Sequence, residues 1–160
     1  MKILIMSDTH GYNESMWDVL KEEKPYDMVV HCGDLEGAEE ELRSRVNCEL
    51  HMVSGNNDFS VGLPRMDTFR IGKQKVLLLH GHKYRIYGDL TPLYYLAREN
   101  EADIVMFGHL HVPIVKMEEG VTLINPGSLT YPRQSDHQRT YIVMTVDEKG
   151  EAHYEVKITA

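Results

Sequence analysis

Five short groups of polar residues, spread evenly along the 160-residue chain, are the part of the sequence that could carry chemistry. They are Asp8-Thr9-His10, Gly33-Asp34, Gly55-Asn56-Asn57-Asp58, His80-Gly81-His82 and Gly108-His109-Leu110-His111. Each group comes directly after a run of apolar residues, at a point where a β-strand should end. Because loops at the carboxyl ends of strands converge on one crevice in α/β folds, we expect these side chains to meet in space.

The residue types in these groups are typical of a transition-metal site. Asp-x-His supplies a carboxylate and an imidazole from one turn, and His-x-His supplies two imidazoles from another. Mixed oxygen and nitrogen ligands favour Mn, Fe, Co, Ni or Zn over Ca or Mg, which prefer oxygen ligands alone. The candidate metal ligands are seven: Asp8, His10, Asp34, Asn56, His80, His109 and His111. Because one tetrahedral ion needs fewer, the count predicts two divalent ions that share a carboxylate, with Mn as the expected metal.

Two such ions indicate phosphoryl chemistry. Ions about 3.5–4 Å apart can clamp both the attacking and the departing oxygen of an in-line displacement, and they acidify a shared water near neutral pH. Two divalent cations, the carboxylates of Asp8 and Asp34 and a bridging hydroxide leave one net positive charge. A monoanionic phosphodiester matches that charge. We therefore predict hydrolysis of a small phosphodiester, such as a cyclic nucleotide, by in-line attack of a metal-bridging hydroxide.

Composition narrows the class of protein and its partners. Binding of long nucleic acid requires a broad basic surface, and the net charge of −8 argues against one, so we expect a small substrate. No apolar run approaches the ~20 residues of a membrane-spanning helix, and no signal-peptide core follows Lys2, so the sequence predicts a cytoplasmic protein. With no secretory context, Cys32 and Cys48 are expected to be thiols. A chain of this length favours a single domain over 1–160, and a homo-oligomer is left open.

The pattern of apolar residues alternates strands and helices. We expect strands over 2–6, 26–31, 49–53, 68–71, 75–79, 104–107, 112–116, 121–124, 140–146 and 153–158, and helices over 13–23, 36–45 and 93–99. Asn13 or Ser15 should cap the first helix, and Thr91 should cap the third with Pro92 at its first position. The short turn at 72–74 predicts an antiparallel hairpin. This order favours two sheets packed face to face with helices outside, an α/β sandwich.

The ordered set of groups resembles the metallophosphoesterase superfamily, also called calcineurin-like phosphoesterases. Within it, the chain looks like the small, capless bacterial and archaeal phosphodiesterases of the YfcE-like branch, from Met1 to about Thr145. Asn125-Pro126-Gly127-Ser128, followed by Pro132-Arg133, also matches that branch. The resemblance implies a four-layer αββα sandwich.

The resemblance also implies a role for each ligand residue. The first ion would be held by Asp8, His10, Asp34 and His111, and the second by Asp34, Asn56, His80 and His109. Asp34 would bridge the two ions. We expect Asp34, Asn56 and His109 to act directly in catalysis.

One position departs from the family pattern. Many relatives have a histidine, thought to protonate the leaving group, where this chain has Asn57. Because an amide cannot donate a proton in that way, we expect either substrates with acidic leaving groups or a substitute acid such as His82. Asp58 is expected to orient His10 or another ligand, and Arg85 and Arg133 are candidates for phosphate contact.

Other functions remain open within the same superfamily. It contains a non-enzymatic scaffold, the small subunit of the retromer sorting complex, and His80-Gly81-His82 followed by Gly88-Asp89 is similar to the corresponding stretch there. A scaffold should lose ligand residues, whereas all seven are present here. A phosphomonoesterase or a nucleotide pyrophosphatase is the remaining alternative.

Overall fold

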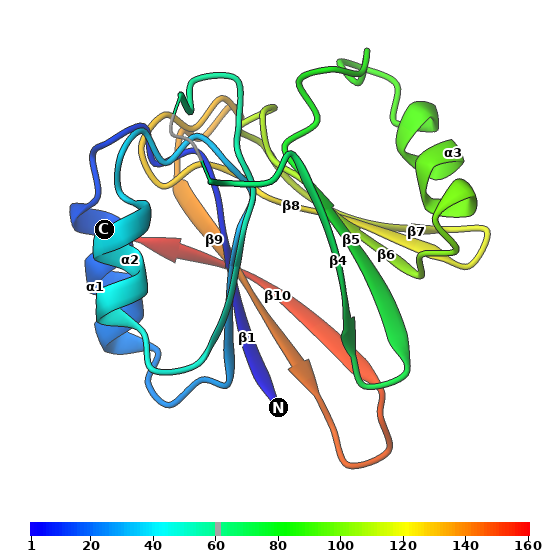
Figure 1. Cartoon of the computed structure of the whole chain (residues 1–160), viewed down its shortest axis with the longest axis horizontal. Helices are drawn as coiled ribbons and strands as arrows, with labels where there is room; N and C mark the ends of the chain where they lie inside the picture. Colours follow the sequence, from blue (N-terminus) through cyan, green and yellow to red (C-terminus); the bar gives the residue numbers. More distant parts are fainter. Residues whose placement is uncertain (60–61) are drawn as a thin grey trace.

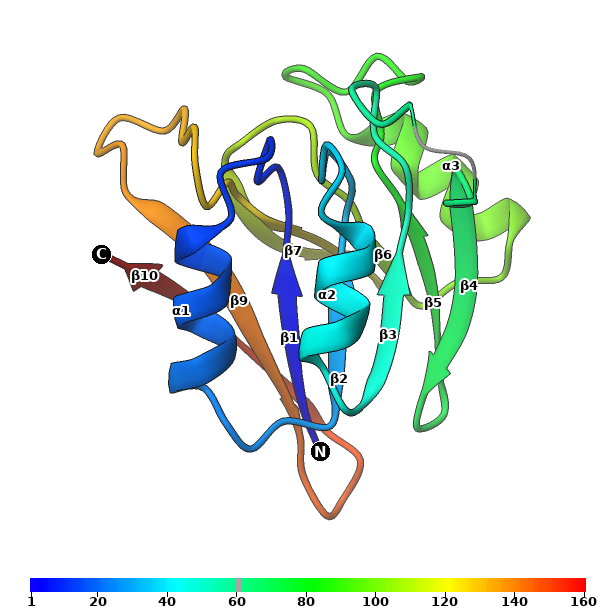
Figure 2. The same cartoon turned by 60° about the vertical axis from the view of Figure 1, so that its left-hand side comes forward.

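The computed structural model of the chain describes residues 1–59 and 62–160. Two mixed sheets of five strands each pack face to face (Figures 1 and 2). The first sheet contains, in spatial order, β10 (Ala152–Thr159), β9 (Arg139–Val146), β1 (Lys2–Met6), β2 (Met28–His31) and β3 (Glu49–Met52). The second contains β4 (Met66–Ile71), β5 (Gln74–Leu79), β6 (Ile104–Met106), β8 (Val121–Pro126) and β7 (Pro113–Glu118). The described helices are α1 (Glu14–Glu22), α2 (Glu39–Arg45) and α3 (Thr91–Glu99).

Three buried apolar clusters separate four layers. Alternation along β1 directs Ile3 and Ile5 into the cluster between the sheets, while Leu4 and Met6 pack with residues of α1 and α2. On the second sheet, side chains of β5, β6 and β8 pack against α3. Figure 1 shows α1 and α2 on one side of the molecule and α3 on the other. The predicted αββα sandwich is confirmed, and helices are confined to the first two-thirds of the described chain.

The parallel strands explain where the polar groups lie. β1, β2 and β3 are parallel neighbours in the first sheet, and β5, β6 and β8 are parallel neighbours in the second. Figure 2 shows β1 and β3 ending at the same edge of the fold. The residues predicted to carry chemistry follow β1, β2, β3, β5 and β6, as the sequence indicated.

The helix starts differ from the expectation. α3 begins at Thr91 after Leu90, and the N–H of Thr91 is accepted by Oδ1 of Asp89 at 3.0 Å, so Asp89 rather than Thr91 supplies the capping oxygen. α1 follows Asn13, whose side chain makes no capping hydrogen bond. α2 begins three residues later than predicted, because Glu36 and Gly37 have positive φ angles of 51° and 95° that a right-handed helix cannot contain.

Two smaller sequence expectations concern helix length and the thiols. No helix in the described ranges is long and apolar enough to span a membrane. Cys32 is buried, Cys48 is partly buried, and both are free thiols, as predicted.

Candidate metal centre and active site

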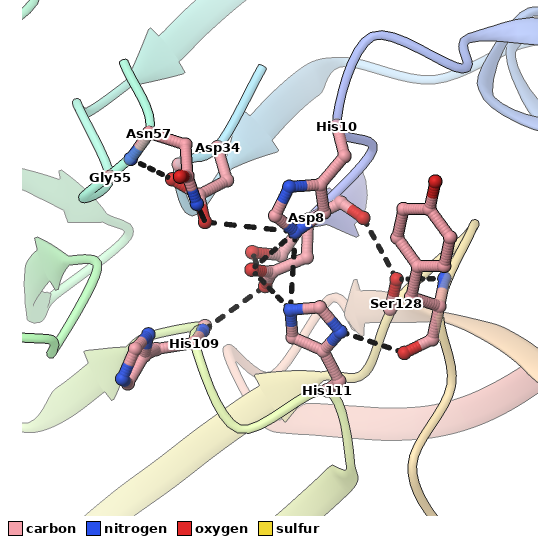
Figure 3. Close-up of polar contacts among 12 residues, drawn as sticks. Asp8, His10, Asp34, Gly55, Asn57, His109, His111 and Ser128 are labelled. Atoms are coloured by element: carbon pink, nitrogen blue, oxygen red, sulfur yellow. Dashed lines mark hydrogen bonds and ion pairs between the residues drawn. The ribbon is translucent and has the colours of Figure 1, made fainter. Parts of the chain in front are cut away.

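Two overlapping groups of candidate ligands lie where the loops after β1, β2, β5 and β6 meet (Figure 3). Asp8, His10 and His111 form one group, and Asp8, Asp34 and His80 form the other. Within each group the ligand atoms lie within 4.8 Å of one another. The structure therefore brings together five of the seven predicted ligands, from positions more than a hundred residues apart.

Carboxylate oxygens face imidazole nitrogens throughout this cluster. Oδ1 of Asp8 lies 3.1 Å from Nε2 of His111 and 3.7 Å from Nε2 of both His10 and His80. Oδ2 of Asp34 lies 3.3 Å from Nε2 of His80 and 3.7 Å from Nε2 of His10. Each carboxylate thus contacts histidines of both sheets, which is the arrangement that two ions sharing ligands require.

The hydrogen bonds around the cluster fit metal binding. Nδ1–H of His80 donates to the carbonyl of Cys32 at 2.8 Å, and Nδ1–H of His111 donates to the carbonyl of Tyr131 at 2.7 Å. These bonds fix the tautomer that leaves a lone pair on Nε2, as in metal-binding histidines. Oδ1 of Asp8 and Nε2 of His80 are buried without a hydrogen-bond partner among the described residues. Buried acceptors left unpaired are costly, and a divalent cation between them removes that cost.

The second carboxylate oxygen of Asp8, Oδ2, accepts two hydrogen bonds that fix the side chain. The hydroxyl of Ser7 donates to Oδ2 at 2.5 Å, and the backbone N–H of His109 donates to the same atom at 3.1 Å. Gly108 allows this approach, since a Cβ there would stand 2.7 Å from Oδ2 of Asp8 and still closer to the Ser7 hydroxyl. The Oδ1 atom is therefore aimed at the histidines.

Asp58 organises the loop that carries Asp34. Its carboxylate accepts the backbone N–H groups of Asp34 and Glu36 at 2.7 Å and that of Gly55 at 2.8 Å. The side chain thus joins the loops after β2 and β3. Asp58 was predicted to orient His10 or another ligand. In the structure it supports the loop of Asp34, and no hydrogen bond of the described residues joins it to His10.

The two neighbouring asparagines lie differently. Asn57 donates its backbone N–H to Oδ1 of Asp34 at 2.9 Å and its side-chain Nδ2–H to Oδ2 at 3.0 Å (Figure 3). Asn56, the predicted ligand, is exposed. In this structure the amide that contacts Asp34 is therefore that of Asn57.

A further group of side chains lies beside the ligand cluster and is called the second wall of the site. It consists of His109, His82 and Tyr87. The ring of His109 points away from Asp8 in Figure 3, with its centroid 5.2 Å from that of His80 and its Nε2 3.3 Å from the hydroxyl of Tyr87. His82 lies beside both histidines, at centroid distances of 5.5 Å from His80 and 6.2 Å from His109. His109 therefore contacts Asp8 through its backbone and faces the outer side of the cluster through its ring.

The two predicted arginines differ in position. Nη1 of Arg133 lies 3.5 Å from the hydroxyl of Tyr87 and 3.5 Å from the carbonyl of His109, at the edge of the second wall. Arg85 is exposed on the loop between β5 and α3. Arg133 is the better placed of the two for a substrate contact.

Neighbouring groups in the cluster keep both carboxylates ionised. Burial raises the pKa of Asp8, but contacts with His10 and His111 and the charge of His80 outweigh it and hold the pKa well below its usual range. Burial likewise opposes ionisation of Asp34, and contacts with His80 and Asn57 nevertheless lower its pKa to about 2. Burial and the neighbouring His80 lower the pKa of His109 to about 4. The site thus supplies ionised carboxylates and a neutral His109 at pH 7.

Ser128 and Asn125 support the site and were not predicted to do so. The Ser128 hydroxyl donates to the carbonyl of Asp8 at 2.8 Å and accepts the N–H of Tyr131 at 2.8 Å (Figure 3). Nδ2–H of Asn125 donates to the carbonyl of Gly108 at 2.9 Å. The one signal for these two residues in the sequence was the match of Asn125-Pro126-Gly127-Ser128 to the family. Single buried hydroxyl and amide groups form no periodic pattern that could have predicted them.

Comparison with known proteins defines the class. Residues 1–149 match the family described as the calcineurin-like phosphoesterase superfamily domain. The chain belongs to this family of metallophosphoesterases, as its ligand pattern predicted.

Individual relatives agree with the family. The probable metallophosphoesterase YsnB of Bacillus subtilis is 34% identical over 148 residues, which are 92% of this chain and 85% of that protein. A conserved Streptococcus pneumoniae protein described as a predicted phosphoesterase superposes with a TM-score of 0.81 at 29% identity, over 98% of this chain and 97% of that one. A single mutant of Vps29 from Entamoeba histolytica superposes with a TM-score of 0.80 at 25% identity, over the full length of both chains.

Proposed function

We propose that the protein is a phosphodiesterase that uses two divalent ions, Mn by preference, to hydrolyse a small phosphodiester by in-line attack of a bridging hydroxide. The observation that carries the proposal is the pair of ligand groups that share Asp8 and lie side by side. Family membership supports the metal-dependent hydrolysis of phosphoesters. Two ions supply positive charge for the phosphoryl oxygens and acidify the attacking water.

The ligands divide between the two ions as the family resemblance implies. His10 and His111 would hold the first ion with Asp8, and His80 and His109 would hold the second with Asn56. Asp34 suits the bridging role because its Oδ2 lies between Nε2 of His10 at 3.7 Å and Nε2 of His80 at 3.3 Å. Rotation of the His109 ring toward His80 and of the Asn56 amide toward Asp34 would complete the second set.

The charge of the site favours a diester, and the missing proton donor favours an acidic leaving group. The site leaves about one net positive charge once both carboxylates and a hydroxide are counted. Asn57 contacts Asp34 through its amide, which is no acid. Burial and the neighbouring His80 lower the pKa of His82, the candidate substitute acid. Substrates with acidic leaving groups, which depart unprotonated, fit this site best.

Metal removal tests the proposal. We expect the purified protein to hydrolyse bis-p-nitrophenyl phosphate in the presence of Mn²⁺, to lose activity after exhaustive chelation, and to regain it when Mn²⁺ is restored. p-Nitrophenyl phosphate, the matched monoester, should be hydrolysed more slowly. Full activity of metal-free protein would end the proposal, and faster hydrolysis of the monoester would replace diester by monoester specificity.

The scaffold alternative rests on the fold shared with Vps29. The complete ligand set and the unpaired Asp8 oxygen and His80 nitrogen favour catalysis, since a scaffold needs neither. Turnover in the chromogenic assay and tight co-purification of a partner separate the two possibilities. No turnover with any tested ion, together with a stoichiometric partner, would favour the scaffold.

A further inference from the structure

A pocket of about 470 Å³ opens beside the ligand cluster, on the side of His10 and His111. It is lined by residues 11–15 and 129–131 and by Arg139. We propose that this pocket binds an aromatic group, such as a nucleoside base, carried by the ester of the phosphodiester that does not leave. The inference rests on the proposed function and names the class of diester that the site would accept. The volume of the pocket falls in the usual range for small-molecule sites, about 300–1,000 Å³.

Two tyrosines form an aromatic bridge from the ligands to the pocket. The ring of Tyr131 lies edge-to-face against His10, with centroids 5.5 Å apart, and edge-to-face against Tyr12 at 6.0 Å. Both tyrosines remain well exposed, at 66% for Tyr12 and 48% for Tyr131. Exposed aromatic rings this close to a candidate metal ligand are suited to stacking on a planar group of the substrate.

The pocket is held in place by the same backbone that holds the ligands. The hydroxyl of Thr130 donates to the carbonyls of Thr9 at 2.9 Å and Tyr12 at 3.2 Å, which joins the two walls. The carbonyl of Tyr131 accepts Nδ1–H of His111. A substrate group in the pocket is therefore positioned relative to the metal-ligand residues without a change in the loops. Such preorganisation lowers the free-energy cost of binding.

The polar groups of the pocket fit a base better than a second phosphate. Asn13 lines the wall, and its Oδ1 atom is buried without a hydrogen-bond partner among the described residues. The guanidinium of Arg139 already donates to the hydroxyl of Ser15 at 3.2 Å, and Glu14 also lines the wall. An acidic residue and two exposed aromatic rings favour a neutral, planar group.

A pair of substrates with one leaving group tests the pocket. Thymidine 5′-p-nitrophenyl phosphate and methyl p-nitrophenyl phosphate both release p-nitrophenolate and differ only in the group that remains. We expect the ratio of their kcat/KM values to favour the thymidine ester, and Tyr12→Ala to lower that ratio about 3- to 10-fold. Tyr12→Phe keeps the ring and should keep the ratio.

Two further tyrosines serve as controls. Tyr95 is 64% exposed and lines a larger cavity between α3 and β7, away from the ligands, so Tyr95→Ala should leave both rates unchanged. Tyr87 is equally exposed but stands against His109 on the opposite wall. An unchanged ratio in Tyr12→Ala, or a fall in the ratio with Tyr87→Ala instead, would overturn the inference while leaving the phosphodiesterase proposal intact.

Absence of hydrolysis of both esters by the Mn²⁺-loaded wild type would count against the proposed function itself. Binding then tests the pocket separately. Calorimetry should show tighter binding of thymidine 5′-phosphate than of methyl phosphate to the wild type, and Tyr12→Ala should remove most of the difference. Equal affinities of the two phosphates for the wild type would refute the pocket.

Discussion

Five of the seven predicted ligand residues have backbone conformations that non-glycine residues seldom adopt. The φ angles are 55° for Asp8, 49° for His10, 59° for Asp34, 69° for His109 and 58° for His111. Each such conformation costs about 1 kcal/mol or more and persists only where the surroundings enforce it. The concentration of this strain on the ligand residues indicates that the loops are shaped for ligand geometry rather than for stability.

Removing the charge of Asp34 tests its shared role. We expect Asp34→Asn to lower kcat/KM for bis-p-nitrophenyl phosphate by at least about 100-fold, because it weakens both ions together. Asn56→Ala should cost less, since it weakens the second ion alone. Asp147→Asn, at an exposed carboxylate outside the site, is the matched control. A larger loss in Asn56→Ala than in Asp34→Asn would argue against a bridging Asp34.

Restoring a proton donor tests the reading of Asn57. We expect Asn57→His to speed hydrolysis of a diester with an alkyl leaving group by about 10- to 100-fold, because general acid catalysis contributes at least that much. Hydrolysis of bis-p-nitrophenyl phosphate, whose leaving group needs no proton, should change little. The ratio of the two rates is the measurement. If the alkyl diester gains nothing, a missing acid does not limit this enzyme.

At the scale of elements, apolar periodicity predicted strand and helix positions well, and local hydrogen bonds decided their ends. The hairpin of β4 and β5 was expected, but β4 begins two residues earlier, at Met66, because its partner Leu79 extends the antiparallel ladder. The capping oxygen of Asp89 and the left-handed Glu36 are properties of the folded loops. The sequence therefore located the ligand residues at strand ends but not the side-chain directions of Asn56 and His109.

Asp58 ties together two of those loops, so its loss should loosen the site without removing a ligand. We expect Asp58→Ala to weaken Mn²⁺ binding about 10- to 100-fold, the usual effect of losing a group that supports a ligand. Titration calorimetry with Mn²⁺ alone measures the affinity. Asp67→Ala, which removes a carboxylate paired with His51 at 2.8 Å on β4, is the control. Equal affinities of Asp58→Ala and wild type would show that Asp34 is positioned by other groups.

At the scale of the whole molecule, the layer order was predictable and the strand order was not. The order of strands and helices along the chain indicated two sheets packed face to face with helices outside. The pairing of β1 with β9, and of β6 with β8 in preference to β7, joins segments far apart in the chain. Periodicity along one segment carries no information about such partners. The family resemblance implied the same layer order, as a four-layer αββα sandwich.

A buried ionic cluster far from the ligands fastens the end of α1 to the first sheet. The carboxylate of Glu23, whose side chain is 8% exposed, contacts Nζ of Lys2 at 2.7 Å, accepts the hydroxyl of Tyr141 at 2.6 Å and pairs with Lys157. Burial opposes its ionisation, but Lys157, Lys2 and Tyr141 outweigh burial and lower the pKa to about 2 from 4.5. A depressed carboxyl pKa stabilises the fold above about pH 4.5, and the contribution is lost as the pH falls toward 2.

We therefore expect Glu23→Gln to lower the free energy of unfolding by about 2 kcal/mol at pH 7 and by progressively less between pH 4.5 and pH 2. Urea denaturation at pH 7, 4 and 2.5, read by far-ultraviolet circular dichroism, measures the difference. Glu22→Gln, at the exposed neighbouring carboxylate, should behave as wild type throughout. A difference between Glu23→Gln and wild type that stays constant from pH 7 to pH 2.5 would show that lost packing, and not the ionised carboxylate held by Lys2 and Lys157, accounts for the destabilisation.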